Sequence, residues 1–195
     1  MTEEEFLALN SVYLKKIATG RAVAQATGLP EAVVGEVLAG AESESAGAVV
    51  DVGGGMLMLS EDGVRAVLGG YEARYADCRV DPAVEDWYQR FETLNKQFLE
   101  GVTAWQQDVG DMAKMDRLLK LVERQIRALA SISERIPRYE AYAGRFSHAI
   151  DQVDTGATNY LVSPDVDSIH NIWFEFHEDI LTVLGRPRDV AESAG

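Results

Sequence analysis

Two histidines in the last amphipathic segment have a spacing that could support chemistry. His170 and His177 are seven residues apart, which places both imidazoles on one face of a helix. Asn95 and Gln106 lie in or beside an aromatic stripe of another segment, and a buried amide must find hydrogen-bond partners. We expect these groups to meet in a buried polar cluster, which either holds packed helices in register or binds a small ligand. The candidates are His170, His177, Asn95, Trp105, Gln106, Trp173 and Glu178.

The residues around these histidines do not match a catalytic or metal-binding signature. A di-iron bundle needs Glu-x-x-His on two helices and one more glutamate on each of two others, whereas Glu175 lies only two residues before His177. His148 and Asp151 are one turn apart, a spacing that fits a shared metal or a simple side-chain pair. The sequence has no Gly-x-x-x-x-Gly-Lys phosphate loop and no Gly-x-Ser-x-Gly nucleophile turn. We therefore expect no catalytic residue, metal or cofactor, and a binding or regulatory protein that is not catalytic alone.

The chain is acidic overall but contains one basic segment. Its 195 residues carry a net charge of −14, which disfavours indiscriminate binding to nucleic acid or to an anionic membrane. Residues 114–145 include eight basic and four acidic side chains, a net charge of +4, so the remainder carries −18. This segment is either a solvated or charge-matched helix face, or a site for an anion or an acidic partner. The anion-binding candidates are Arg117, Arg124, Arg138 and Arg145.

Four consecutive segments between residues 83 and 186 carry apolar side chains at a spacing of three and four, which is typical of amphipathic helices. Long helices with short connections predict an antiparallel four-helix bundle. Ser163 is expected to cap the last helix, with Pro164 at its first position and Gly185 at its end. Residues 187–195 are expected to form a loose tail. The four stripes are Val84, Trp87, Phe91, Leu94, Phe98, Val102, Trp105; Met112, Met115, Leu119, Val122, Ile126, Leu129; Tyr139, Tyr142, Phe146, Ala149, Val153; and Val166, Ile169, Trp173, Phe176, Ile180, Val183.

Residues 1–76 have the pattern of a winged helix-turn-helix domain. A helix is predicted over 3–17, with Ile17 among the residues available for burial. A short helix, a turn at 27–29 and a further helix with Pro30 near its first position then give the helix-turn-helix order.

A hairpin and a closing helix complete this pattern. The β-prone runs 48–52 and 56–59 flank three consecutive glycines, which predicts a β-hairpin. Ser60 is expected to cap a helix that ends near Tyr75. The expected fold class is therefore mainly α: a winged helix-turn-helix with a small hairpin, followed by an antiparallel four-helix bundle.

The expected winged helix lacks the charges that DNA binding requires. Phosphate contacts come mainly from lysine and arginine, and residues 22–64 contain neither but include seven acidic side chains. We therefore expect this domain to contact protein instead of DNA. The alternative is a transcriptional regulator in which the helical domain dimerises or senses a ligand. The sequence leaves the oligomeric state open.

Several features predict a cytoplasmic location. No apolar run approaches the roughly 18 residues of a membrane span, and the first residues are acidic where a secretory signal would be basic. The single cysteine, Cys78, cannot form an internal disulfide.

Several stretches resemble a C-terminal extension found in some actinobacterial proteins related to pyruvate phosphate dikinase and phosphoenolpyruvate synthase. In those proteins a winged-helix-like stretch precedes the helical part, so the resemblance covers most of this chain. It is a likeness of the whole pattern and not of a short motif. The stretches are Phe-Glu-Thr-Leu-Asn-Lys-Gln-Phe-Leu at 91–99, Thr-Ala-Trp-Gln at 103–106, the run 160–181, and Gly185-Arg186.

The resemblance implies a non-catalytic accessory or regulatory subunit. The related enzymes transfer phosphate through a histidine in a Thr-x-Gly-Gly-x-x-Ser-His-like stretch and carry an ATP-grasp domain, and this sequence contains neither. His148 follows a serine and precedes an alanine but lacks the glycines. The chain would then work beside separate dikinase-like phosphotransferase subunits. A small organic ligand such as a phenol would fit an aromatic-lined pocket.

Overall fold

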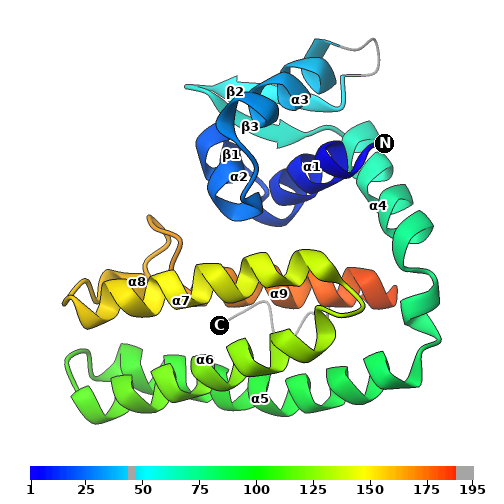
Figure 1. The fold of residues 1–195 in the computed structure, drawn as a ribbon. Helices are drawn as coiled ribbons and strands as arrows, with labels where there is room; N and C mark the ends of the chain where they lie inside the picture. Colours follow the sequence, from blue (N-terminus) through cyan, green and yellow to red (C-terminus); the bar gives the residue numbers. More distant parts are fainter. Residues whose placement is uncertain (44–46, 188–195) are drawn as a thin grey trace. The chain divides into compact units, whose positions relative to one another are not determined.

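The computed structural model describes residues 1–43 and 47–187, which are mainly helical with one small antiparallel sheet (Figure 1). The chain forms two compact units. Unit 1 comprises Met1–Arg79 and the described residues from Glu178 onward, and unit 2 comprises Val80–His177. The expected loose tail lies outside the described residues from position 188 onward. None of the described helices is both long enough and apolar enough to cross a membrane.

Unit 1 contains the helices and strands that the N-terminal pattern predicts, and one strand that it does not. The unexpected strand β1 spans only Ala18–Thr19, too short to produce an alternating pattern. It pairs with β3, so the antiparallel sheet has the order β1-β3-β2. The elements are α1 (Glu3–Lys15), β1 (Ala18–Thr19), α2 (Gly20–Thr27), α3 (Glu31–Ser43), β2 (Val49–Gly53), β3 (Met56–Leu59), α4 (Glu61–Tyr75) and the short 3₁₀ helix η1 (Asp77–Arg79).

Short polar side chains begin the helices of unit 1. Thr2 and Glu5 form a reciprocal capping box at α1, Thr19 caps α2, and Ser60 caps α4 as predicted. Gly28 ends α2 in the left-handed conformation, with φ of 74°, which glycine adopts at little cost. These local signals explain why the element boundaries follow the sequence pattern closely.

Two glycine positions depend on the absence of a side chain. The hairpin turn between β2 and β3 uses Gly53, Gly54 and Gly55 at φ values of 108°, 68° and 73°, which disfavour any other residue. In α4, a Cβ atom on Gly63 would lie 2.1 Å from the carbonyl oxygen of Ala48. The start of α4 can therefore pack closely against the chain that leads into β2.

The core of unit 1 forms around aromatic rings of α1 and α4. Phe6 packs edge-on against Tyr71 at 5.3 Å between ring centroids, and Tyr75 lies beside both rings. Val34 and Leu38 of α3 are buried, whereas Val33 and Val37 are only half-buried. The expected burial of Ile17 is wrong. Since α1 ends at Lys15, Ile17 lies between the helix and strand β1 and is 47% exposed.

Unit 2 contains four long helices and two short ones. The last long helix begins later than predicted: Ser163 follows a short helix, and the hydroxyl of Ser168 accepts a hydrogen bond from the backbone N–H of Asn171. This helix ends before Gly185, which adopts φ of 65°, as the sequence predicts. The elements are α5 (Pro82–Gln107), α6 (Met112–Ile132), η2 (Pro137–Tyr139), α7 (Glu140–Asp154), α8 (Asn159–Val162) and α9 (Ile169–Leu184), of which α9 continues into the residues grouped with unit 1.

The predicted apolar stripes of α5 and α7 are buried in full. The stripe of α9 is buried from Ile169 onward. The stripe predicted for α6 is partly wrong. Leu118 and Gln125 are buried where Leu119 and Ile126 were expected, and Met112 is 60% exposed. The buried face of α6 is thus rotated from the one expected, and it brings a polar amide into the core of unit 2.

Candidate functional site

Asn95 of α5 and Trp173 of α9 form a buried hydrogen bond in unit 2. The indole Nε1 of Trp173 donates to Oδ1 of Asn95 at 2.9 Å. An indole N–H can only donate, which fixes the orientation of the Asn95 amide. Phe98 stacks on the Trp173 ring at 3.9 Å between centroids. The amide Nδ2 of Asn95 is buried without a hydrogen-bond partner among the described residues.

His177 of α9 meets a carboxylate instead of the predicted amide. Its Nε2 atom lies 3.2 Å from Oε1 of Glu92, and the ring is 3% exposed. The ring also packs edge-on against Phe91 at 5.3 Å between centroids. The sequence therefore identifies the right pair of helices, α5 and α9, but the wrong partner for the histidine.

Three other candidates lie outside this buried cluster. Gln106 is exposed, so its expected role as a buried amide is wrong. His170 is half-buried, and burial lowers the pKa of its imidazole. Among the described residues no hydrogen bond joins His170 to Asn95 or Gln106. Trp105 is buried in the apolar core, as its place in the stripe predicts.

Glu178 is half-buried and groups with unit 1. Burial, followed by the negative charge of Glu178, raises the pKa of the Tyr13 phenol. Glu178 therefore does not join the cluster formed by Asn95, Trp173, Glu92 and His177.

Gln125 of α6 is a polar core residue that the sequence analysis missed. Its side chain is fully buried, and neither Oε1 nor Nε2 has a hydrogen-bond partner among the described residues. Trp87 Nε1 donates to the carbonyl of Ala128, and the side chain of Leu118 lies close to Gly101. These two contacts place Trp87 beside Ala128 and Gly101 beside Leu118, so α5 and α6 run antiparallel. Counted along the helices from these contacts, Gln125 lies within about one helical turn of Asn95. The burial of Gln125 could have been predicted, because position 125 continues the spacing of three and four residues set by Met115, Leu118 and Val122.

Arg145 of α7 is buried between two carboxylates, which corrects its expected role in anion binding. Its guanidinium donates to both carboxylate oxygens of Asp167, at 2.8 and 2.6 Å, and to Oε2 of Glu175 at 2.7 Å. Burial alone would lower the pKa of Arg145, but the Asp167 hydrogen bonds and the two negative charges raise it. The guanidinium also lies over the ring of Tyr142. Arg145 therefore joins α7 to α9 through Glu175 and to the turn before α9 through Asp167, and its buried charge is matched by these two carboxylates.

The other three arginine candidates do not converge on one site. Arg117 is exposed, Arg124 donates to Oε1 of Gln97 at 3.2 Å, and Arg138 lies over the ring of Tyr139 at 4.8 Å. Arg117 and Arg124 are exposed on α6, and Arg138 is half-buried on η2.

Unit 1 has a buried polar cluster of its own. Oη of Tyr71 lies 2.8 Å from Asn10 and 3.0 Å from Oδ1 of Asp179, and all three side chains are buried. The Tyr71 hydroxyl is the donor towards both Oδ1 of Asn10 and Oδ1 of Asp179, and these two acceptors share its single proton. Ser11 places a further buried hydroxyl on the same helix as Asn10. These groups join α1 and α4 to the end of α9.

The outer face of the sheet in unit 1 is apolar and exposed. Its side chains are between 40% and 48% exposed. In the pairing register Val50 lies opposite Met58, and continuing the β1–β3 register places Ile17 level with Met58. The outer sheet face consists of Ile17, Val50, Val52, Met56 and Met58.

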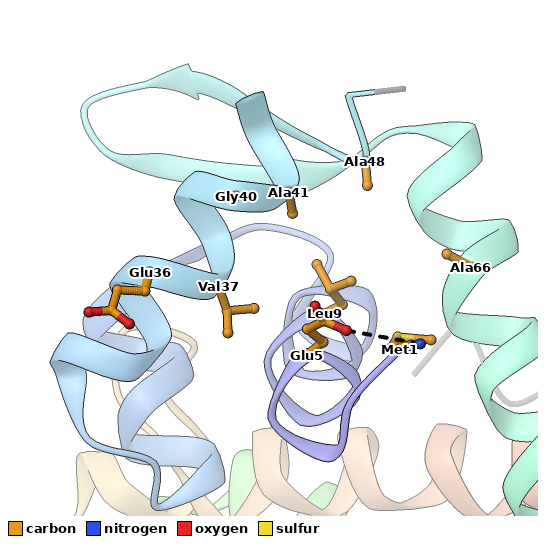
Figure 2. A pocket seen from close by; sticks show the side chains of 9 residues that line it. All are labelled: Met1, Glu5, Leu9, Glu36, Val37, Gly40, Ala41, Ala48 and Ala66. Atoms are coloured by element: carbon orange, nitrogen blue, oxygen red, sulfur yellow. Dashed lines mark ion pairs between the residues drawn. The ribbon is translucent and has the colours of Figure 1, made fainter. Parts of the chain in front are cut away.

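A half-open pocket of about 540 Å³ lies among α1, α3 and α4 of unit 1. Figure 2 shows Val37 and Ala41 of α3 on one side, Ala66 of α4 on the other, and Leu9 of α1 between them. The lining is mostly small and apolar. Of its two carboxylates, Glu5 accepts a hydrogen bond from the backbone N–H of Thr2 at 2.6 Å and lies 4.0 Å from the terminal ammonium of Met1, and Glu36 is the other.

Within residues 1–43 and 47–187, no three histidine, cysteine or acidic side chains are grouped so that they could hold a metal ion. No family model, curated protein or solved structure matches the chain.

Proposed function

We propose that the chain is a non-catalytic binding or regulatory subunit whose N-terminal unit contacts protein instead of DNA. In this proposal unit 1 is a winged helix-turn-helix, with α3 in the position of a recognition helix and the β2–β3 hairpin as the wing. The four long helices α5, α6, α7 and α9 form an antiparallel bundle. The proposal rests on the element order and the antiparallel β1-β3-β2 sheet.

The charge of α3 is the observation that carries the proposal. Its exposed positions include Glu31, Glu36 and Glu42, together with alanine and glycine. No lysine or arginine occurs between Ala22 and Val64, so neither α3 nor the hairpin can neutralise a phosphate. The three glycines at the hairpin tip also carry no side chain that could enter a groove. An acidic surface of this kind repels DNA and favours a protein partner.

The interior of unit 2 supports a structural role for the bundle over a catalytic one. The buried histidine is paired with Glu92, and the buried arginine is held by two carboxylates. These groups fix the positions of helices relative to one another within the unit. None of them is left open towards a described pocket, which is the arrangement expected of a scaffold.

The resemblance to a dikinase-type extension supplies the class of partner. We propose that the subunit acts in the cytoplasm beside a dikinase-like phosphotransferase that uses phosphoenolpyruvate or a related phosphate donor. Such an enzyme supplies the phosphohistidine and nucleotide-binding domains that this sequence does not contain. The accessory chain would position or regulate those domains, with a small organic molecule as the acceptor of phosphate.

A DNA-binding assay run in parallel with an activity assay tests this proposal. A gel-shift series at increasing salt concentration should show no salt-sensitive, sequence-selective shift. Purified chain alone should show no phosphotransfer from phosphoenolpyruvate or ATP, and adding it to a dikinase-like enzyme should change that enzyme's rate. Selective DNA binding that weakens steeply with salt would favour a transcriptional regulator, and turnover by the chain alone would show that it is an enzyme.

A further inference from the structure

We propose that the outer sheet face and the free edge of β2 bind an extended segment of a protein partner, with alternating apolar and basic side chains. This inference rests on the proposed function, because it names the surface through which unit 1 would contact protein. The added segment would pair with β2 as a fourth strand, its apolar side chains continuing the exposed face. This is the strand-addition mode of peptide recognition.

The position of β2 provides the backbone partner. In the order β1-β3-β2, the strand β2 lies at an edge, so within residues 1–43 and 47–187 one side of its main chain has no neighbouring strand. Exposed sheet edges are readily paired by another chain unless charge or proline protects them. β2 spans Val49–Gly53 and contains neither a lysine nor a proline, and its one charged residue is Asp51, which disfavours an acidic partner strand and favours a basic one.

The alternation of side chains along β2 specifies the apolar half of the partner. Val50 lies opposite Met58 on the outer face, Val52 is exposed at the register shift between Asp51 and Gly53, and Ile17 is exposed directly before β1. A strand paired with β2 would place every second side chain beside these residues, since side chains alternate between the two faces. Val, Ile or Met at those positions would cover the exposed valines.

Charge specifies the polar side chains of the partner segment. Asp51 lies between the two valines, is exposed, and has no ion pair among the described residues. Glu61 and Asp62 follow β3 after Ser60, and Asp62 forms an ion pair with Arg65 of its own helix. Opposite charges on neighbouring strands are stabilising and like charges are destabilising. Lysine or arginine in the alternate positions of the partner therefore matches this edge.

The size of the face favours a peptide segment over a second copy of the chain. Five side chains at this exposure present on the order of 400 Å² of apolar surface, about half of the roughly 800 Å² that each partner buries in a stable complex. Two copies joined through β2 would also bring the two Asp51 side chains towards each other, which is unfavourable. A short strand obtains the rest of its affinity from main-chain hydrogen bonds.

The test is a titration of the full chain with two blocked synthetic hexapeptides, one of alternating valine and lysine and one of alternating valine and glutamate. Amide chemical shifts of the ¹⁵N-labelled chain should change first in β2, and the valine–lysine peptide should bind about fivefold more tightly. Asp51→Asn keeps the side-chain oxygen that accepts from the Gly53 N–H and should remove most of that preference.

Matched variants separate the sheet face from apolar surface in general. Val50→Thr combined with Met58→Gln should weaken binding by about fivefold or more, because both substitutions keep side-chain size but remove apolar contact. Leu68→Gln, on an equally exposed position of α4, should leave binding unchanged. Thermal unfolding of each variant checks that the fold is retained, and the shift map of the unmodified chain stands whether or not a variant folds.

The inference is overturned if millimolar valine–lysine peptide leaves the β2 amides unshifted, if the two peptides bind equally, or if Leu68→Gln weakens binding as much as the sheet variants. These outcomes are distinct from failure of the proposed function. A chain that binds the peptide at β2 but also binds DNA selectively retains the surface and loses the proposed function. A chain that binds neither loses only the surface.

Discussion

Asn95 and Trp173 are joined by a hydrogen bond of 2.9 Å at the centre of unit 2, and one turn further along α9 His177 meets Glu92, one turn earlier on α5. From the first contact to the second, the residue number rises along α9 and falls along α5, as it must in two antiparallel helices. Both contacts are between polar groups inside an aromatic core. They therefore fix the axial register of α5 against α9 more narrowly than apolar packing would.

Replacing Asn95 by leucine is expected to destabilise unit 2 by about 1–3 kcal/mol, because the buried Trp173 N–H loses its acceptor. All three tryptophans of the chain lie in unit 2, so urea unfolding followed by tryptophan fluorescence reports on that unit. An unchanged free energy of unfolding would show that Trp173 finds another acceptor or that the bond contributes nothing.

The opposite result is expected for Gln125→Leu. The fully buried amide has no partner among the described residues, so its removal relieves a desolvation cost and should stabilise unit 2 by about 1 kcal/mol. The same fluorescence experiment measures this change, and Asn95→Leu serves as its contrast. A loss of stability larger than about 1 kcal/mol would mean that the Gln125 amide is satisfied in solution.

Arg145→Met is expected to destabilise unit 2 by about 3–5 kcal/mol, because Asp167 and Glu175 would face each other without a cation. Arg124→Met is the control. Arg124 is exposed, so its loss should change stability by less than about 0.5 kcal/mol. Equal effects of the two substitutions in urea unfolding would contradict the role given to the buried guanidinium.

The half-buried His170 should make unit 2 less stable in mild acid. Burial lowers the pKa of its imidazole below that of the unfolded chain, so the unfolded state binds more protons once the pH falls below about 6.5. The free energy of unfolding therefore decreases as the pH falls below about 6.5. At higher pH both states carry a neutral His170, and no stability is lost through this residue. His170→Gln should flatten the dependence, measured by urea unfolding between about pH 5 and pH 8. Parallel curves for both proteins would exclude His170 as its source.

Two glycines of α4 should respond in opposite ways to alanine. A Cβ atom at Gly63 would lie 2.1 Å from the carbonyl oxygen of Ala48, a backbone atom that cannot move aside easily, whereas nothing lies within 4 Å at Gly69. Gly63→Ala should therefore lower the melting temperature of unit 1, followed by far-ultraviolet circular dichroism. Gly69→Ala should raise stability by about 0.5–1 kcal/mol, because alanine is the better helix former. The same sign for both changes would contradict the close approach at Gly63.

The local structure of this chain could be predicted from the sequence because its signals act over a few residues. The stripe from Val84 to Trp105 made α5 amphipathic, Ser60 capped α4, and Gly53–Gly55 closed the hairpin without any help from distant contacts. Strand β1 was missed because two residues show no alternation, and it exists only through pairing with β3. Ile17 was misplaced for the same reason.

The partners of the polar side chains were decided by the tertiary structure alone. Helical periodicity fixes which face of a helix is apolar, but the axial offset between two helices follows from the packing of many side chains at once. A change of one turn exchanges Glu92 for Asn95 as the partner of His177, and a small rotation of α6 places Gln125 in the core in place of Ile126. Arg145 illustrates the same limit, because its basic neighbours in the sequence suggested an anion site and only the fold brings Asp167 and Glu175 to its guanidinium.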